Sequence, residues 1–218
     1  MSIGKECALL FAVLFLPGMI AQGGGVDPQA FDSLFYHVQL LATAVPQILL
    51  VVALGELRRN GSARRFGWTA PSKADVLPAL TALLGVWAVV GVVSIGIGAV
   101  AGLDGGVEPT VDWSFERTEL IPVALVSTLA IGYREELFYR AYVADRAPEA
   151  GLDRRLALAA GAVLFAAGHL YQGVAGFIVA LAIGLVLAEI YLRTRSLHGI
   201  AVAHGLYNFM VLIASGSA

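Results

Sequence analysis

A pair of adjacent glutamates in an apolar context is the feature of this sequence best suited to chemistry. Glu135 and Glu136 stand in the stretch 132–140 together with Arg134 and Arg140, directly after a long apolar run. Ionisable groups at membrane depth are costly and usually face a protein interior or a water-filled cavity. The cluster is therefore a candidate functional site if other segments supply partners for it.

Helix geometry separates the two glutamates. Residues four apart share a helix face, so Glu136 and Arg140 can pair, whereas Glu135 points to an adjoining face. Two neighbouring carboxylates in a low-dielectric cavity do not both ionise easily, and such a carboxylate is a candidate general base for activating water. The same residues also fit a solvated turn at a helix end, in which glutamates and arginines neutralise one another.

Two later segments carry residue types that could be partners of the glutamates. His169 ends a short apolar segment with small neighbours, and it follows Phe165 by four residues. His204 and Asn208 are also four apart and offer hydrogen-bond donors that could stabilise an oxyanion. Both sets have a structural alternative: His169 as a packing residue, and the pair as an interhelical hydrogen bond worth about 1 kcal/mol in lipid.

The composition places these residues in a membrane protein. The chain of 218 residues is 58% hydrophobic and 14% charged, with a mean hydropathy of +0.79, whereas a soluble domain has roughly 25% charged residues. The net charge of −2 comes without a basic patch, so we expect no nucleic-acid partner. The single cysteine, Cys7, can form no internal disulfide. We predict one integral membrane domain, residues 1–218, with a motif-bearing core at about 119–214.

Seven apolar segments are candidate spans of an all-α, polytopic transmembrane bundle. The first could instead be a signal peptide, but Glu6 and Pro17 disturb that pattern, so we expect a retained helix. The segments comprise residues 7–22, 34–57, 76–103, 119–142, 156–170, 174–192 and 197–214.

The connections between these segments differ in charge. One set, with the N-terminus, carries all of the 14 Lys and Arg except Arg117, whereas the alternate connections are acidic. Positive charge stays inside, which predicts a multi-pass protein of the cytoplasmic membrane, with the N-terminus in the cytoplasm and the C-terminus outside. The basic connections lie at 58–73, 134–155 and 193–195, and the acidic ones at 27–32 and 104–116.

This orientation creates a conflict of depth. It places His169 nearer the outside, whereas Glu135 and Glu136 lie nearer the cytoplasm. A contact between them requires a tilted or re-entrant fifth segment, or a deep cavity.

Three short motifs, in this order and on successive segments, resemble the CPBP family, the CAAX-protease and bacteriocin-processing intramembrane endopeptidases related to the type II CAAX prenyl endopeptidase. The resemblance covers roughly residues 120–214, and Ala141 departs from it where many members have glycine. The motifs are EExxxR at Glu135, Glu136 and Arg140, FxxxH at Phe165 and His169, and HxxxN at His204 and Asn208.

The resemblance implies a helical bundle with a polar cavity opening toward the cytoplasm, and an endopeptidase that cuts a peptide or membrane-protein substrate near or within the bilayer. It also implies a role for each matching residue. Glu135 or Glu136, with His169, would activate a water, His204 and Asn208 would stabilise the oxyanion, and Arg140 would hold the glutamates.

Metal dependence is a separate question. HExxH is absent, and a zinc ion would need Glu135 or Glu136 together with His169 and His204, from three helices. A metal-free mechanism is equally consistent with the residues. We favour no obligatory cofactor, with zinc as the alternative.

Other functions fit the same polar set. A non-proteolytic membrane partner, such as an immunity or scaffolding protein, would use it as an interhelical network. A proton or small-molecule transporter could use Glu135 and Glu136 as a relay, although no inverted repeat is visible. Substrate identity, prenylation and oligomeric state are left open by the sequence.

Overall fold

The chain folds as a bundle of helices. The computed structural model describes residues 2–23, 27, 29–59, 67–101 and 115–215, and every regular element within these ranges is helical. The prediction of an all-α membrane bundle is confirmed at this level. The helices are α1 (Ile3–Leu14), α2 (Leu16–Gln22), α3 (Leu34–Arg59), α4 (Val76–Ala101), α5 (Ile121–Glu136), the π-helix η5 (Leu137–Tyr142), α6 (Val143–Arg146), α7 (Arg154–Ala167), α8 (Gly173–Thr194) and α9 (Leu197–Ser215).

Short 3₁₀ turns join several of these helices. Each lies next to the start or end of a helix, and five of them are described. They are η1 (Ala30–Asp32), η3 (Lys73–Asp75), η4 (Thr118–Leu120), η6 (Ala147–Ala150) and η7 (Leu170–Gln172).

Fewer helices qualify as spans than the sequence predicted. Among the described residues, α3, α4, α8 and α9 are long and apolar enough to cross a membrane, and α1 with α2 makes a fifth candidate, bent by 43°. The predicted segments 119–142 and 156–170 do not qualify. The first is interrupted by its charged cluster, and the second forms α7, whose 14 residues extend ~21 Å against a hydrocarbon core of ~30 Å. The prediction of seven full spans is therefore not supported beyond four or five.

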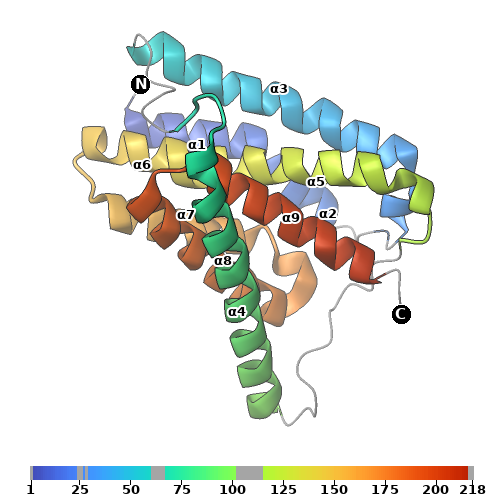
Figure 1. Ribbon diagram of the computed structural model, residues 1–218. Coiled ribbons are helices and arrows are strands. Elements are labelled where there is room, and N and C mark those ends of the chain that lie inside the picture. Colours follow the sequence, from blue (N-terminus) through green and yellow to red (C-terminus); the bar gives the residue numbers. More distant parts are fainter. Residues whose placement is uncertain (1, 24–26, 28, 60–66, 102–114, 216–218) are drawn as a thin grey trace.

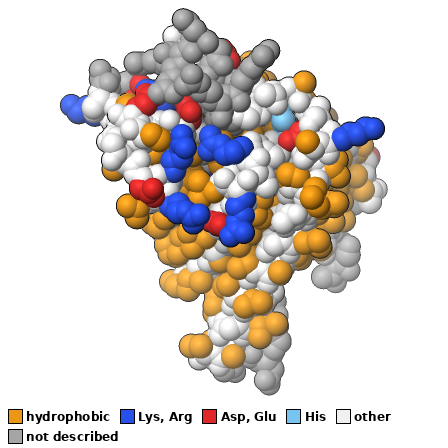
Figure 2. All heavy atoms as spheres, turned by 60° about the vertical axis from the view of Figure 1, so that its left-hand side comes forward, with side chains coloured by type: hydrophobic (Ala, Val, Ile, Leu, Met, Phe, Trp, Pro, Cys, Tyr) orange, Lys and Arg blue, Asp and Glu red, His pale blue; other side chains and the backbone are white. Residues whose placement is uncertain are grey.

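The outer surface of the bundle suits lipid. Large apolar side chains on α3 and α4 point away from the rest of the protein; Phe35, Leu77 and Val100, for example, are 76%, 72% and 91% exposed. Figure 2 shows hydrophobic side chains over much of one face, with the charged side chains gathered toward its upper part. An apolar exterior around a partly polar interior is the arrangement that a bilayer stabilises.

Helix α5 occupies the middle of the bundle. It packs between α3 on one side and α9 on the other, and these three helices run side by side in Figure 1. Helix α4 crosses them steeply and packs on α8 and α9, while α7 pairs with α8. The residues at the end of α5 are thus surrounded by other helices.

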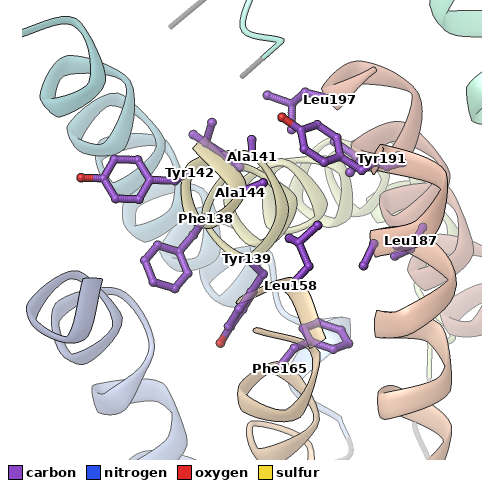
Figure 3. Packing of buried hydrophobic residues seen from close by; sticks show 14 of the residues in the cluster. Phe138, Tyr139, Ala141, Tyr142, Ala144, Leu158, Phe165, Leu187, Tyr191 and Leu197 are labelled. Atoms are coloured by element: carbon purple, nitrogen blue, oxygen red, sulfur yellow. The ribbon is translucent and has the colours of Figure 1, made fainter. Parts of the chain in front are cut away.

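The π-helix η5 continues α5 without a break and forms the centre of the hydrophobic core. All six of its residues are buried, and Figure 3 shows Phe138, Tyr139 and Tyr142 radiating from it toward different neighbours. The ring of Tyr139 meets that of Phe165 on α7, with centroids 5.6 Å apart. A π turn inside a helix is rare and often marks a functional site.

The first segment folds as part of this bundle. The carboxylate of Glu6 on α1 is buried, accepts a hydrogen bond from the hydroxyl of Tyr142, and pairs with Arg146 at 3.1 Å. Lys5, the neighbour of Glu6 in the chain, therefore lies at the same end of the bundle as Arg146. The connecting charges at 60–66 and 102–114, which also entered the prediction of orientation, lie outside the described residues.

Breaking the Glu6 ion pair should destabilise the protein. Removing one partner of a buried pair leaves an uncompensated charge, so Glu6→Gln should cost about 3 kcal/mol and lower the thermal unfolding midpoint in detergent. The control is Glu119→Gln, whose pair with Arg117 has both side chains more than half exposed, and it should change little. Equal midpoints for the two variants would contradict the docking of α1 described here.

Candidate active site

Glu135, Glu136 and His204 come together at the centre of the bundle. The Nδ1 atom of His204 lies 2.8 Å from Oε1 of Glu136, and its Nε2 lies 3.7 Å from Oε2 of Glu135. The imidazole ring of α9 is therefore held between the two carboxylates of α5. The solvated turn at a helix end, the alternative interpretation of this stretch, does not describe it, because His204 and Glu136 are buried.

Arg140 neutralises Glu136, as the four-residue spacing predicted. Its Nη1 donates to Oε1 of Glu136 at 2.9 Å, its Nη2 donates to the carbonyl of Gly184 at 3.2 Å, and the side chain is 1% exposed. The guanidinium also lies 4.8 Å from the centroid of the Phe165 ring. A charge buried this deeply is tolerated only when it is paired and hydrogen-bonded.

The two glutamates differ in environment. Oε1 of Glu136 serves both Arg140 and His204, and its Oε2 is buried with no hydrogen-bond partner among the described residues. Glu135 is 12% exposed and pairs instead with Arg134 at 3.0 Å. Each carboxylate thus has its own arginine, so the expected repulsion between the two is offset. Glu135 is the more accessible of the pair.

Glycines allow α9 to come this close to α5. A Cβ on Gly132 would lie 2.7 Å from the carbonyl oxygen of Ala201, and one on Gly205 would lie 2.7 Å from the Cα of Leu129. Real side chains essentially never make contacts of this length, so the two backbones meet where neither residue has a side chain. Gly205 directly follows His204, and the close approach delivers its ring to the glutamates.

His169 lies in a turn rather than in a helix. Helix α7 ends at Ala167, and His169 precedes η7 (Leu170–Gln172). Helix α7 has 14 residues and the chain turns at its end, so the fifth segment is not the full span that the conflict of depth assumed.

Phe165 connects His169 to the other site residues. Its ring centroid lies 4.6 Å from that of His169 and 5.6 Å from that of His204. The carbonyl of Phe165 lies 2.9 Å from Nδ1 of His169. A carbonyl only accepts, so Nδ1 carries the proton and the neutral ring keeps Nε2 as an acceptor.

Asn208 lies one helical turn beyond His204 on α9 and is half-buried. Within the part of the chain that the structure describes, its carboxamide makes no hydrogen bond to another residue. Its two donors are therefore available to a bound molecule.

Two further histidines, His37 and His198, are also buried. His37 hydrogen-bonds to Ser127 Oγ and to the carbonyl of Phe31, each at 2.8 Å, and His198 hydrogen-bonds to Tyr133 and to the carbonyl of Thr69. They hold helices and loops together. No local sequence signal distinguishes such histidines from His204, because burial depends on distant segments.

The candidate zinc ligands named from the sequence are Glu135, Glu136, His169 and His204. Among the described residues, no group of three or more His, Cys, Asp and Glu side chains is arranged to hold a metal ion. Nδ1 of His204 is engaged by Glu136, and Nδ1 of His169 by a carbonyl, so Nε2 is the nitrogen that each ring keeps open. The same hydrogen bonds are also those of a histidine that ligates a metal through Nε2.

These features define a helical membrane protein with a buried centre of carboxylates and histidines. The comparisons agree with this description. Residues 117–210 match the sequence model of the family described as type II CAAX prenyl endopeptidase Rce1-like. The match covers less than half of the chain, includes all three motifs, and confirms the resemblance to the CAAX-protease family.

Neither a curated protein nor a solved structure matches the chain. The matched family is a family of proteases, which supports a peptidase with a peptide substrate.

The glycine contact between α5 and α9 should be intolerant of side chains. Gly205→Ala should cost about 1–3 kcal/mol, because the added methyl group forces the helices apart. Gly91→Ala on α4 is the matched control, since nothing lies within 4 Å of its Cβ position, and it should leave stability unchanged or slightly raised. Thermal unfolding of the two variants in the same detergent compares them; a stable Gly205→Ala variant would refute the close approach.

Proposed function

We propose that the protein is an intramembrane endopeptidase that hydrolyses peptide bonds with a water activated by Glu135 and His169. The observation that carries this proposal is the convergence of Glu135, Glu136 and His204, within 3.7 Å, inside a bundle whose C-terminal part matches a protease family. A buried carboxylate–histidine cluster is expensive in an apolar bundle, and a structural role alone would need fewer charges.

Glu135 is the better candidate for the general base. Its side chain is 12% exposed, whereas that of Glu136 is fully buried and engaged by Arg140 and His204. Glu135 would take a proton from the water while the hydroxide adds to the peptide carbonyl, and Nε2 of His169 would accept the second hydrogen bond of that water. Glu136 then acts by positioning His204.

The oxyanion formed by this addition needs donors. His204 gives its Nδ1–H to Glu136, so in its imidazolium form Nε2–H is the donor that remains, and Asn208 adds its carboxamide one turn away. Collapse of the tetrahedral intermediate breaks the C–N bond, and the proton held by Glu135 passes to the leaving amine. The net reaction adds one water across the peptide bond, and no atom changes its oxidation state.

The charge distribution supports a multi-pass protein of the cytoplasmic membrane, with a cytoplasmic N-terminus and a polar cavity opening on that side. Glu6 and Arg146 form an ion pair, which keeps the first helix and the basic connection after α5 at one end. In this arrangement, α3, α4, α8 and α9 surround the short α7 and the charged end of α5 and separate them from the lipid.

Replacing the base should abolish cleavage. Purified protein in detergent should cut a prenylated or unmodified CAAX peptide, and Glu135→Gln should lower kcat by at least about 10³-fold, because the amide cannot take the proton from water. Glu189→Gln is the control; its pairs with Arg155 and Arg193 are exposed on α8. Full activity in Glu135→Gln would exclude the mechanism. Loss of thermal stability in Glu136→Ala, with no peptide ever cut, would favour the non-proteolytic partner.

A chelator should leave the activity intact. Among the described residues, no group of three ligand-type side chains is arranged to hold a metal ion, so treatment with 1,10-phenanthroline followed by dialysis should change kcat less than about twofold. The measurement is peptide cleavage before treatment, after treatment, and after re-addition of zinc. Loss of activity that zinc restores would replace the metal-free mechanism with a zinc-dependent one.

A further inference from the structure

The N-terminal helix pair reaches the candidate site through Phe15. This residue lies at the junction of α1 and α2, where the axis bends by 43°, and it is buried. The guanidinium carbon of Arg134 lies 5.2 Å from the centroid of its ring. The same ring packs against Tyr139 and Phe138, with centroid distances of 4.6 Å and 5.3 Å. Phe15 therefore covers the point where α5 passes into η5.

Arg134 connects this aromatic cover to Glu135. Its Nη2 donates to Oε1 of Glu135 at 3.0 Å, while its Nε is buried without a hydrogen-bond partner among the described residues. Adjacent residues on a helix do not face one another, so the geometry of α5 does not by itself bring the two side chains together. A long arginine side chain with one hydrogen bond needs a second contact to stay in place, and the Phe15 ring supplies it as a cation–π interaction.

We infer that Phe15 is a positioning residue for the reaction: its ring holds Arg134 against Glu135, and Arg134 in turn fixes the carboxylate beside His204. The inference rests on the proposed endopeptidase function. Phe15 lies outside the residues 117–210 that match the family, so this support is contributed by the N-terminal part of the chain. Buried Glu6, bonded to Tyr142 and Arg146, anchors the same helix at its other end.

The test compares leucine and tyrosine at position 15. Phe15→Leu keeps an apolar side chain but removes the π face, and it should lower kcat about tenfold with little change in KM. Phe15→Tyr keeps the ring and should retain most of the activity. Phe11→Leu is the matched control, because Phe11 neighbours the rings of Phe15 and Tyr139 and no contact joins it to Arg134 within the described residues. Full activity in Phe15→Leu, or an equal loss in Phe11→Leu, would overturn the inference.

A second measurement separates this inference from the function on which it rests. Thermal unfolding of Phe15→Leu, Arg134→Gln and the double variant forms a cycle that needs no catalysis. Arg134→Gln should lower stability less in the Phe15→Leu background than in the wild type, because the contact between the two side chains is already lost there. Additive effects would overturn the contact. If the wild type cuts no peptide, the proposed function fails, and the cycle still decides whether Phe15 holds Arg134.

Discussion

The buried carboxylate of Glu136 is the constraint around which the bundle is arranged. An isolated carboxylate in an apolar interior is too costly to persist, so it needs a counter-charge and hydrogen-bond donors from its surroundings. Arg140 arrives from the π-helix η5 and His204 from α9, while α8 supplies a carbonyl for the second arm of the arginine. Three helices thus meet at one carboxylate. Polar contacts fix the positions of these helices relative to one another, because the hydrocarbon of a bilayer offers no other hydrogen-bond partners.

Small residues make that meeting geometrically possible. Gly132 and Gly205 bring two backbones together beside the cluster, and Gly184 leaves space for Arg140. In lipid, close packing and interhelical hydrogen bonds replace the hydrophobic effect as the force between helices. The glycines and the charged residues therefore act together. The glycines permit the close approach of helices that the buried ion pairs require.

The two adjacent glutamates illustrate how one sequence pattern yields two environments. Glu136 is enclosed and engaged, whereas Glu135 is the more exposed of the two and is held by Arg134 and, through it, by Phe15. A buried network that orients an accessible reactive group is a common division in active sites, since orientation requires rigidity and reaction requires access. The short α7 contributes in the same way, because the turn after its end places His169 against Phe165, whose ring also neighbours His204.

The sequence by itself determined the membrane class, the helical content, the Glu136–Arg140 pair and the three motifs that lie together in the bundle. Composition and i, i+4 spacing are local properties, and both are legible in a single chain. Only the tertiary structure decided that α7 is too short to span, that His37 and His198 are buried, and that Phe15 covers Arg134. Burial and contact between residues more than 100 positions apart depend on how helices pack. No local pattern carries that information, because the lipid-facing and protein-facing sides of an apolar helix look alike in sequence.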